Sequence, residues 1–84
     1  MSIILKIGRV TNYYDKIGIG VIELIGGLTV GDTVKFIKDD KDLFEQKVDS
    51  IQIEHRKVNH APSGSVVGLK LLQAVTDDVE VYKI

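Results

Sequence analysis

The sequence predicts an all-β fold, a small closed barrel, in a single domain spanning residues 1–84. Stretches rich in β-branched and aromatic residues are separated by turn residues roughly every 8–14 positions, a spacing typical of barrels and sandwiches. No segment shows an apolar period of 3.6 residues over the ten or so positions that a helix needs. With 84 residues and 44% apolar content, the chain has the size and composition of one domain with one core.

Six strands account for most of the sequence. A turn at 14–16 separates the first two, and the polar stretch 39–42 forms another turn. The expected strands are Ile3–Tyr14, Ile17–Ile25, Thr33–Lys38, Phe44–His55, Val66–Gln73 and Val79–Ile84.

Two glycine-containing corners connect these strands. Leu28 and Val30 alternate before Gly31 and Asp32, where glycine accepts a positive φ at little cost and the carboxylate hydrogen-bonds the turn backbone. A similar corner lies at Gly64. Each corner ends one extended piece and begins the next.

The apolar pattern of the fourth strand changes phase. Val48 has one parity, whereas Ile51 and Ile53 have the other, so strict alternation would expose one group to water. We expect a β-bulge near Asp49 and Ser50, and a similar phase change near Gly8. Bent strands of this kind favour a closed barrel over an open sheet.

The composition excludes several classes of protein. The absence of cysteine removes disulfides and thiolate metal sites, and it fits a reducing cytoplasm, where we expect the protein to work. No apolar run approaches the roughly 20 residues of a membrane helix, and the first residues lack the pattern of a signal peptide. A net charge of −1 counts against a sequence-independent nucleic-acid binder, although a local basic face remains compatible with it.

The order and spacing of several motifs carry a family resemblance over nearly the whole chain. The motifs are Gly8-Arg9-Val10, Leu28-x-Val30-Gly31-Asp32-x-Val34, Val48-x-Ser50-Ile51 and Ala61-x-x-Gly64-x-x-x-Gly68-Leu69. The chain resembles the β-barrel second domain of translational GTPases such as elongation factor Tu, and short translation elongation factor-like proteins. Two turns depart from that pattern, at Gly64-Ser65 and at 76–79. The resemblance implies a Greek-key barrel of six strands that acts as a non-catalytic binding module in translation.

We expect no enzyme activity, no cofactor and no metal site. His55 and His60 lie near Glu54, but strand alternation sends Glu54 and His55 to opposite faces, and zinc needs three or four converging ligands. The acidic turn 39–42 lacks the ligand spacing of a calcium loop. Residues 26–33 have the glycine spacing of a phosphate-binding loop, but Asp32 stands at its lysine position, so no GTPase activity is expected.

Two clusters of basic and aromatic residues are the candidate binding site. Aromatic rings between cations can stack on bases while the cations contact phosphates, so these clusters together would form an RNA-contacting face. The candidate residues are Arg9, Tyr13, Tyr14, Lys16, His55, Arg56, Lys57 and His60. The expected partners are tRNA, ribosomal RNA or a translation-associated protein, with neither a membrane nor a small-molecule substrate.

The alternative is a protein-docking module for a larger partner protein, without direct RNA contact. Ile22, Leu24 and Ile25 supply apolar side chains to both faces of one strand. If the core needs only one face, the surplus apolar side chains mark a contact surface. If the strand instead contains another bulge, both sets belong to the core.

Overall fold

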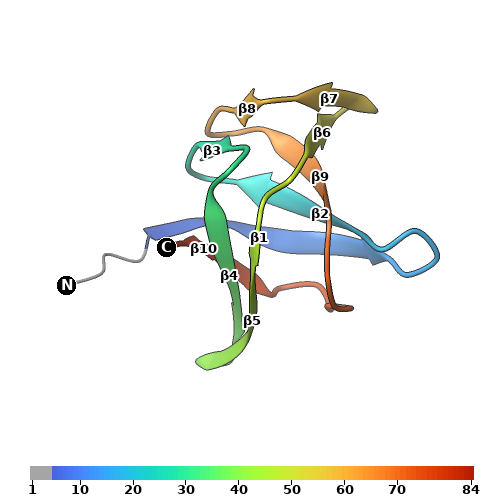
Figure 1. The fold of residues 1–84 in the computed structure, drawn as a ribbon. Coiled ribbons are helices and arrows are strands. Elements are labelled where there is room, and N and C mark those ends of the chain that lie inside the picture. The colour runs from blue at the N-terminus through green and yellow to red at the C-terminus, as the bar shows by residue number, and fades with distance from the viewer. Residues whose placement is uncertain (1–4) are drawn as a thin grey trace.

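The computed structural model describes residues 5–84, and all regular secondary structure in that range is β-strand (Figure 1). This confirms the all-β prediction. The described part of the chain contains ten strands: β1 (Leu5–Tyr14), β2 (Ile19–Leu24), β3 (Leu28–Thr29), β4 (Thr33–Lys38), β5 (Lys41–Lys47), β6 (Ile51–Ile53), β7 (Arg56–Val58), β8 (His60–Ala61), β9 (Val66–Lys70) and β10 (Glu80–Lys83). Residues 5–84 contain no helix long and apolar enough to cross a membrane.

The strands form one large antiparallel sheet and one short ladder. The large sheet has the order β5-β4-β10-β1-β2-β9-β6-β7, and β3 pairs with β8. The sheet curls around one core, but among the described residues no ladder joins its two ends (Figure 1). The prediction of a closed six-stranded barrel is therefore wrong. The sheet ends at β5 and β7, and β6 meets β9 through the single pair Gln52 and Gly68.

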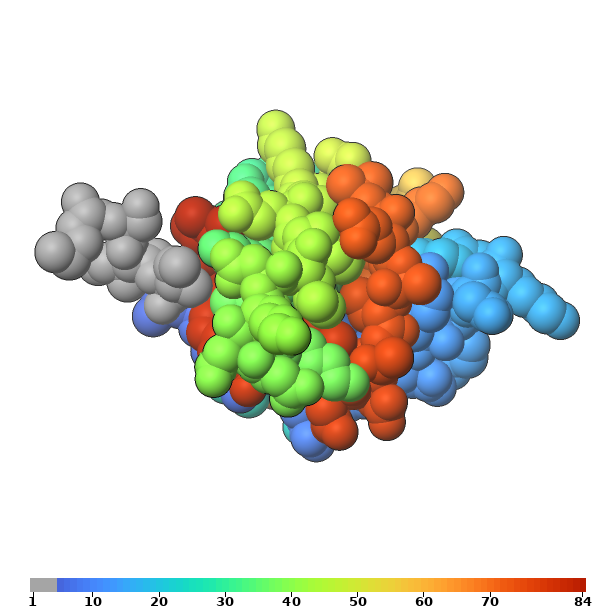
Figure 2. Space-filling view, turned by 90° about the horizontal axis from the view of Figure 1, so that it is seen from below, coloured from blue at the N-terminus to red at the C-terminus, as the bar shows by residue number. Residues whose placement is uncertain are grey.

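A side chain bridges the open seam beside β5. The Gln46 amide donates a hydrogen bond to the Lys70 carbonyl and accepts one from the Leu72 amide, both at 2.8 Å. Figure 2 shows residues 70–78 running alongside β5 on this side of the molecule. One glutamine thus makes the two hydrogen bonds that a neighbouring strand would otherwise provide at this point.

The core fills the concave side of the sheet. Along β2 and β4, buried residues that point inward alternate with residues that point outward. Phe36 is fully buried and stacks on Phe44, with ring centroids 4.5 Å apart. The other large and fully buried side chains are Ile22, Leu24, Leu28, Ile51 and Leu69.

Both predicted corners are confirmed. Gly31 has a φ of 100° and Gly64 a φ of 90°, a region that side chains rarely adopt. The Asp32 carboxylate accepts a hydrogen bond from the Thr29 amide at 2.9 Å, as the sequence predicts for this turn.

The two predicted phase changes have different outcomes. The register of β1 against β10 shifts between Lys6 and Gly8, which confirms the irregularity near Gly8. The predicted bulge at 49–50 is wrong, because the expected strand Phe44–His55 breaks into β5 and β6 with residues 48–50 outside both. The Val48 amide donates to the Asp32 carbonyl at 2.8 Å, so the chain leaves the sheet to bond the Gly31 corner. Val48 and Ile51 are both buried, as the phase change requires.

Other expected strands are longer than the observed ones. Residues 71–73 and 79 lie outside β9 and β10, because residues 71–79 cross the end of the sheet and bond the β1–β2 hairpin. The Leu71 amide donates to the Gly18 carbonyl, and the Asp78 amide to the Val10 carbonyl. The expected start of the first strand at Ile3 lies outside the described residues.

Candidate functional site: an apolar groove on the outer face of the sheet

The outer face of the large sheet divides at β1 into two halves with different chemistry. Directly paired residues of antiparallel strands point to the same face, so the pairing aligns side chains in rows across the sheet. We call the first half the paired face; its rows are Lys6–Tyr82–Lys35–Glu45 and Arg9–Glu80–Ile37–Asp42. We call the second half the groove face; its rows are Asn12–Val21–Gly68–Gln52–Lys57 and Tyr14–Ile19–Lys70.

Lysine 35 is the centre of the paired face. Its Nζ lies 2.7 Å from Asp42 Oδ2 and 3.8 Å from Glu45 Oε2, and its side chain is only 17% exposed. The hydrogen bond to Asp42 is the main reason that the pKa of Lys35 is raised. Charges on this half of the sheet therefore find their partners within the domain.

A second polar cluster on the paired face joins three residues. The Tyr82 hydroxyl donates a hydrogen bond to the Glu80 carboxylate, and Lys6 Nζ lies 3.6 Å from the other Glu80 oxygen. The hydrogen bond from Tyr82 lowers the pKa of Glu80, and the same bond raises the pKa of Tyr82.

The groove face instead carries a hollow of about 290 Å³ with mostly apolar walls. Its floor and walls come from β2, β6 and β9, and its two ends from the β1–β2 hairpin and the β6–β7 turn. The lining residues are Tyr14, Ile17, Ile19, Val21, Gln52, Glu54, His55, Val66, Val67 and Gly68. Tyr14, Ile17 and Val66 are each at least half exposed and line the same hollow, and grouped exposed apolar side chains can mark a binding site.

Glycine 68 makes the groove possible. It lies between Val21 and Gln52 in one cross-strand row, so the missing side chain leaves a hollow in the middle of the face. A Cβ added there would lie 3.3 Å from Ile19 Cγ2, inside the groove. The position thus controls the depth of the hollow.

The β6–β7 turn holds one end of the groove in a costly conformation. Glu54 has a φ of 49° and His55 a φ of 67°, the pair of positive angles of a two-residue hairpin in which Asn-Gly is the preferred sequence. Left-handed backbone costs an ordinary L-residue roughly 1–2 kcal/mol. The turn places Glu54 and His55 together on the groove, so the expectation that alternation separates them is wrong.

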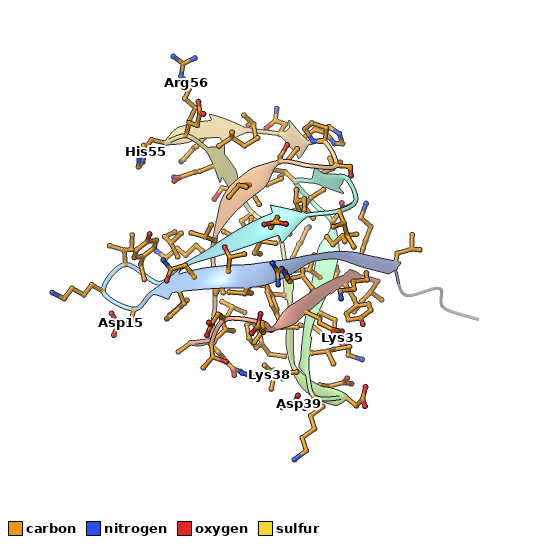
Figure 3. All side chains as sticks on the ribbon, turned by 180° about the vertical axis from the view of Figure 1, so that it is seen from behind. Asp15, Lys35, Lys38, Asp39, His55 and Arg56 are labelled. Carbon is orange, nitrogen blue, oxygen red and sulfur yellow. The ribbon has the colours of Figure 1, made fainter. Side chains whose placement is uncertain are left out.

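The structure brings only two of the predicted site residues together. Tyr14 and His55 both line the groove, whereas Tyr13 packs against the core. Arg9 Nη1 lies 3.6 Å from Asp78, and His60 bonds Thr29. The other predicted residues lie outside the groove lining: Lys16, Arg56 and Lys57. Figure 3 shows Asp15 of the β1–β2 turn and His55 on one side of the molecule, with Lys35 and Asp39 away from them.

Sequence reasoning missed most of the groove. Ile19 and Val21 alternate with the inward residues of β2, and this outward apolar pair was a readable signal. Of the three residues predicted to supply a surplus apolar face, Ile22 and Leu24 are core residues, and Ile25 is exposed away from the groove lining. Gly68 gave no signal, because its role depends on pairing with β2 and β6.

One further polar pair in residues 5–84, Thr29 and His60, lies outside the groove lining. No group of three or more His, Cys, Asp or Glu in that range could hold a metal ion. Thr29 Oγ1 and His60 Nδ1 are 2.8 Å apart, the distance of a nucleophile and its base. Neither residue lines the groove, nor the smaller hollows beside Gln46 and Leu72 or beside Asn12 and Asp77.

The described residues define a small all-β domain with a curled, open antiparallel sheet. The structure is similar to the C-terminal domain of a protein named as a U32 peptidase from Geobacillus thermoleovorans, with a TM-score of 0.87 and 21% identity over 95% of this chain and 92% of that one. A selenomethionine variant of that domain gives a TM-score of 0.84 at 20% identity, covering 90% of this chain and 95% of the other. These likenesses show the fold.

A curated relative gives the matching result in sequence. The chain is 40% identical over 78 residues to an uncharacterized protease of Methanocaldococcus jannaschii, a match that covers 93% of this chain and 19% of the relative. The chain therefore spans about a fifth of the length of that relative. No protein-family model matches the chain.

These comparisons correct the predicted identity and function. The resemblance to translation elongation factors is wrong, because the relative and the solved domains are named as proteases. The function of an RNA-contacting translation module is wrong for the same reason. The motifs that suggested it, such as the Gly31 and Gly64 corners, are turn and core features that small bent sheets share. The comparisons do not test tRNA, ribosomal RNA or a translation-associated protein as partners, so these partners stay predictions.

Proposed function

We propose that this chain is a non-catalytic accessory domain of the U32-peptidase type, which holds a polypeptide while a separate catalytic part cleaves it. The observation that carries the proposal is the 40% identity to a protease over 93% of this chain. That match leaves about four fifths of the relative outside it, enough to contain a catalytic part. The fold of a U32 peptidase C-terminal domain supports the same role.

The chemistry of the described residues supports a non-catalytic role. Peptide hydrolysis needs an activated nucleophile or a metal-bound water. The Thr29 and His60 pair lies outside the groove, and the groove offers one carboxylate and one imidazole among apolar walls. Such a site is suited to binding side chains. We also propose the cytoplasm as its compartment, which the lack of cysteine supports.

An add-back experiment tests this function. The purified chain alone should release no fluorescence from labelled casein. The Methanocaldococcus protease without its matched 78-residue segment should cleave casein less well than the intact protein, and addition of this chain should restore part of the loss. Serum albumin at the same concentration is the control. Cleavage by the chain alone, or no restoration, contradicts the proposal.

A further inference from the structure

The groove has the size for side chains of an extended peptide. Its volume of about 290 Å³ lies at the lower limit of the roughly 300–1,000 Å³ of small-molecule sites, so it suits one or two side chains. The walls formed by Ile17, Ile19 and Val66 are apolar, and apolar contact gains free energy in proportion to the area removed from water. The first requirement for an occupant is therefore an apolar side chain.

The charge of the groove sets the second requirement. With histidine counted as neutral, Glu54 carries the only formal charge in the lining formed by residues 5–84. Glu54 makes no ion pair with any described residue, unlike Lys35 and Glu80 on the paired face. Lys57 and Lys70 end the two cross-strand rows but do not line the hollow. A cation next to the apolar group would complement this carboxylate.

The remaining polar groups fit the same occupant. Tyr14 lines the groove together with Glu54, and a tyrosine ring attracts an arginine guanidinium placed over its face. Gln52 offers an amide that can donate to, and accept from, a peptide backbone. Glu54 and His55 form this turn where Asn-Gly would form it at lower cost, which is consistent with a role for these side chains in binding.

We infer that the groove binds an extended peptide segment in which an apolar side chain is next to a basic residue. The apolar side chain enters the hollow over Gly68, and the basic side chain pairs with Glu54 beside Tyr14. The inference rests on the proposed accessory function and names the polypeptide class that it would hold.

Fluorescence polarisation with three labelled, capped tetrapeptides tests the inference. The first contains leucine followed by arginine, the second leucine followed by glutamate, and the third serine followed by arginine. We expect the leucine–arginine probe to bind about fivefold or more tightly than the glutamate probe, the effect of one partly exposed ion pair. Equal affinities for the three probes, or no binding, overturn the inference.

Two isosteric substitutions test whether the Glu54 carboxylate causes the preference for arginine over glutamate. Glu54→Gln should reduce the preference for arginine over glutamate to less than about twofold, because it removes the carboxylate and keeps the turn. Asp39→Asn is the matched control, since Asp39 is also a hairpin-turn carboxylate with a positive φ but lies away from the groove. If Glu54→Gln keeps the preference, or Asp39→Asn loses it, the assignment is wrong.

The outcomes separate this inference from the proposed function. Probe binding without restoration in the add-back experiment contradicts only the accessory role. Restoration without any probe preference contradicts only the peptide chemistry. A groove covered by a second copy of the chain would appear as a dimer in size-exclusion chromatography that the probe cannot bind, and this result would also overturn the inference.

Discussion

The paired face and the groove face differ in whether their outward side chains have partners within the domain. On the paired face, Lys35 and Glu80 each have partners within the domain. On the groove face, Ile17 and Val66 remain exposed around Gly68, with Glu54 unpaired among the described residues. The two halves belong to one curled sheet and share only β1. A partner that covers Ile17 and Val66 would gain free energy from the apolar area removed from water.

The largest expected effect on the free energy of unfolding comes from alanine at Gly8, a glycine that the fold needs. Gly68 is the comparison, because only the groove needs a glycine there. A Cβ at Gly8 would lie 2.6 Å from the Glu23 carbonyl oxygen, so the backbone must move. Gly8→Ala should lower the free energy of unfolding by about 2–3 kcal/mol. Gly68→Ala should change it by less than about 1 kcal/mol, because only Ile19 Cγ2 lies near, at 3.3 Å. Urea denaturation measures both, and a larger loss for Gly68→Ala would contradict this distinction.

The seam beside β5 gives the next effect. Gln46→Ala removes both bonds to Lys70 and Leu72, each worth about 1 kcal/mol, so the domain should lose roughly 2 kcal/mol. Hydrogen exchange should accelerate at the Leu72 amide. A variant as stable as the original chain would show that the seam contributes nothing to the fold.

Substitutions in the β6–β7 and β4–β5 turns should change the free energy of unfolding by a smaller amount, and the two turns can be compared directly. Replacing Glu54-His55 by Asn-Gly should raise the free energy of unfolding by about 1 kcal/mol, since both positions have positive φ. The same replacement of Asp39-Asp40 should also stabilise, but less, because Asp tolerates this region better. Only the first replacement should abolish binding of the leucine–arginine probe. Thermal denaturation and polarisation together check this, and loss of binding in the Asp39-Asp40 variant would contradict it.

The smallest effect is the pH dependence of the paired face. The folded pKa of Glu80 is lowered, so its contribution is present above the unfolded value of about 4.3 and is lost as pH falls through the folded value. The folded pKa of Tyr82 is raised, so its contribution is present below about 10 and is lost as pH rises through the folded value.

Tyr82→Phe should weaken the dependence of the free energy of unfolding on pH at both the acidic and the alkaline end. Chemical denaturation between pH 3 and roughly 11 measures this, because the hydrogen bond needs an ionised Glu80 and a protonated Tyr82. An unchanged pH dependence in the variant would show that other groups control it. The groove variant Ile17→Ser is the control that should leave the pH dependence intact.

The sequence predicted local features better than closure. Gly31, Gly64 and the irregularity near Gly8 follow from residue type and apolar parity, which are local properties. The break at 48–50 depends on the Val48 amide reaching the distant Asp32 carbonyl, and no local pattern reports such a bond. A barrel and an open curled sheet share the same alternation, so parity cannot distinguish them.

The candidate site was predicted only in part, for a similar reason. Tyr14 and His55 stood out by residue type, but basic and aromatic composition favoured RNA over a groove. The hollow depends on the cross-strand register that aligns Gly68 with Val21 and Gln52. A strand glycine becomes meaningful only after its neighbours across the sheet are known.

Chemical-shift mapping of the leucine–arginine tetrapeptide on ¹⁵N-labelled protein tests the central claim most directly. The account predicts that the shifted amides cluster at 17–21, 52–55 and 66–68, while those of Lys35, Glu80 and Tyr82 stay in place. Shifts centred on the paired face, or no shifts at millimolar peptide, would contradict it.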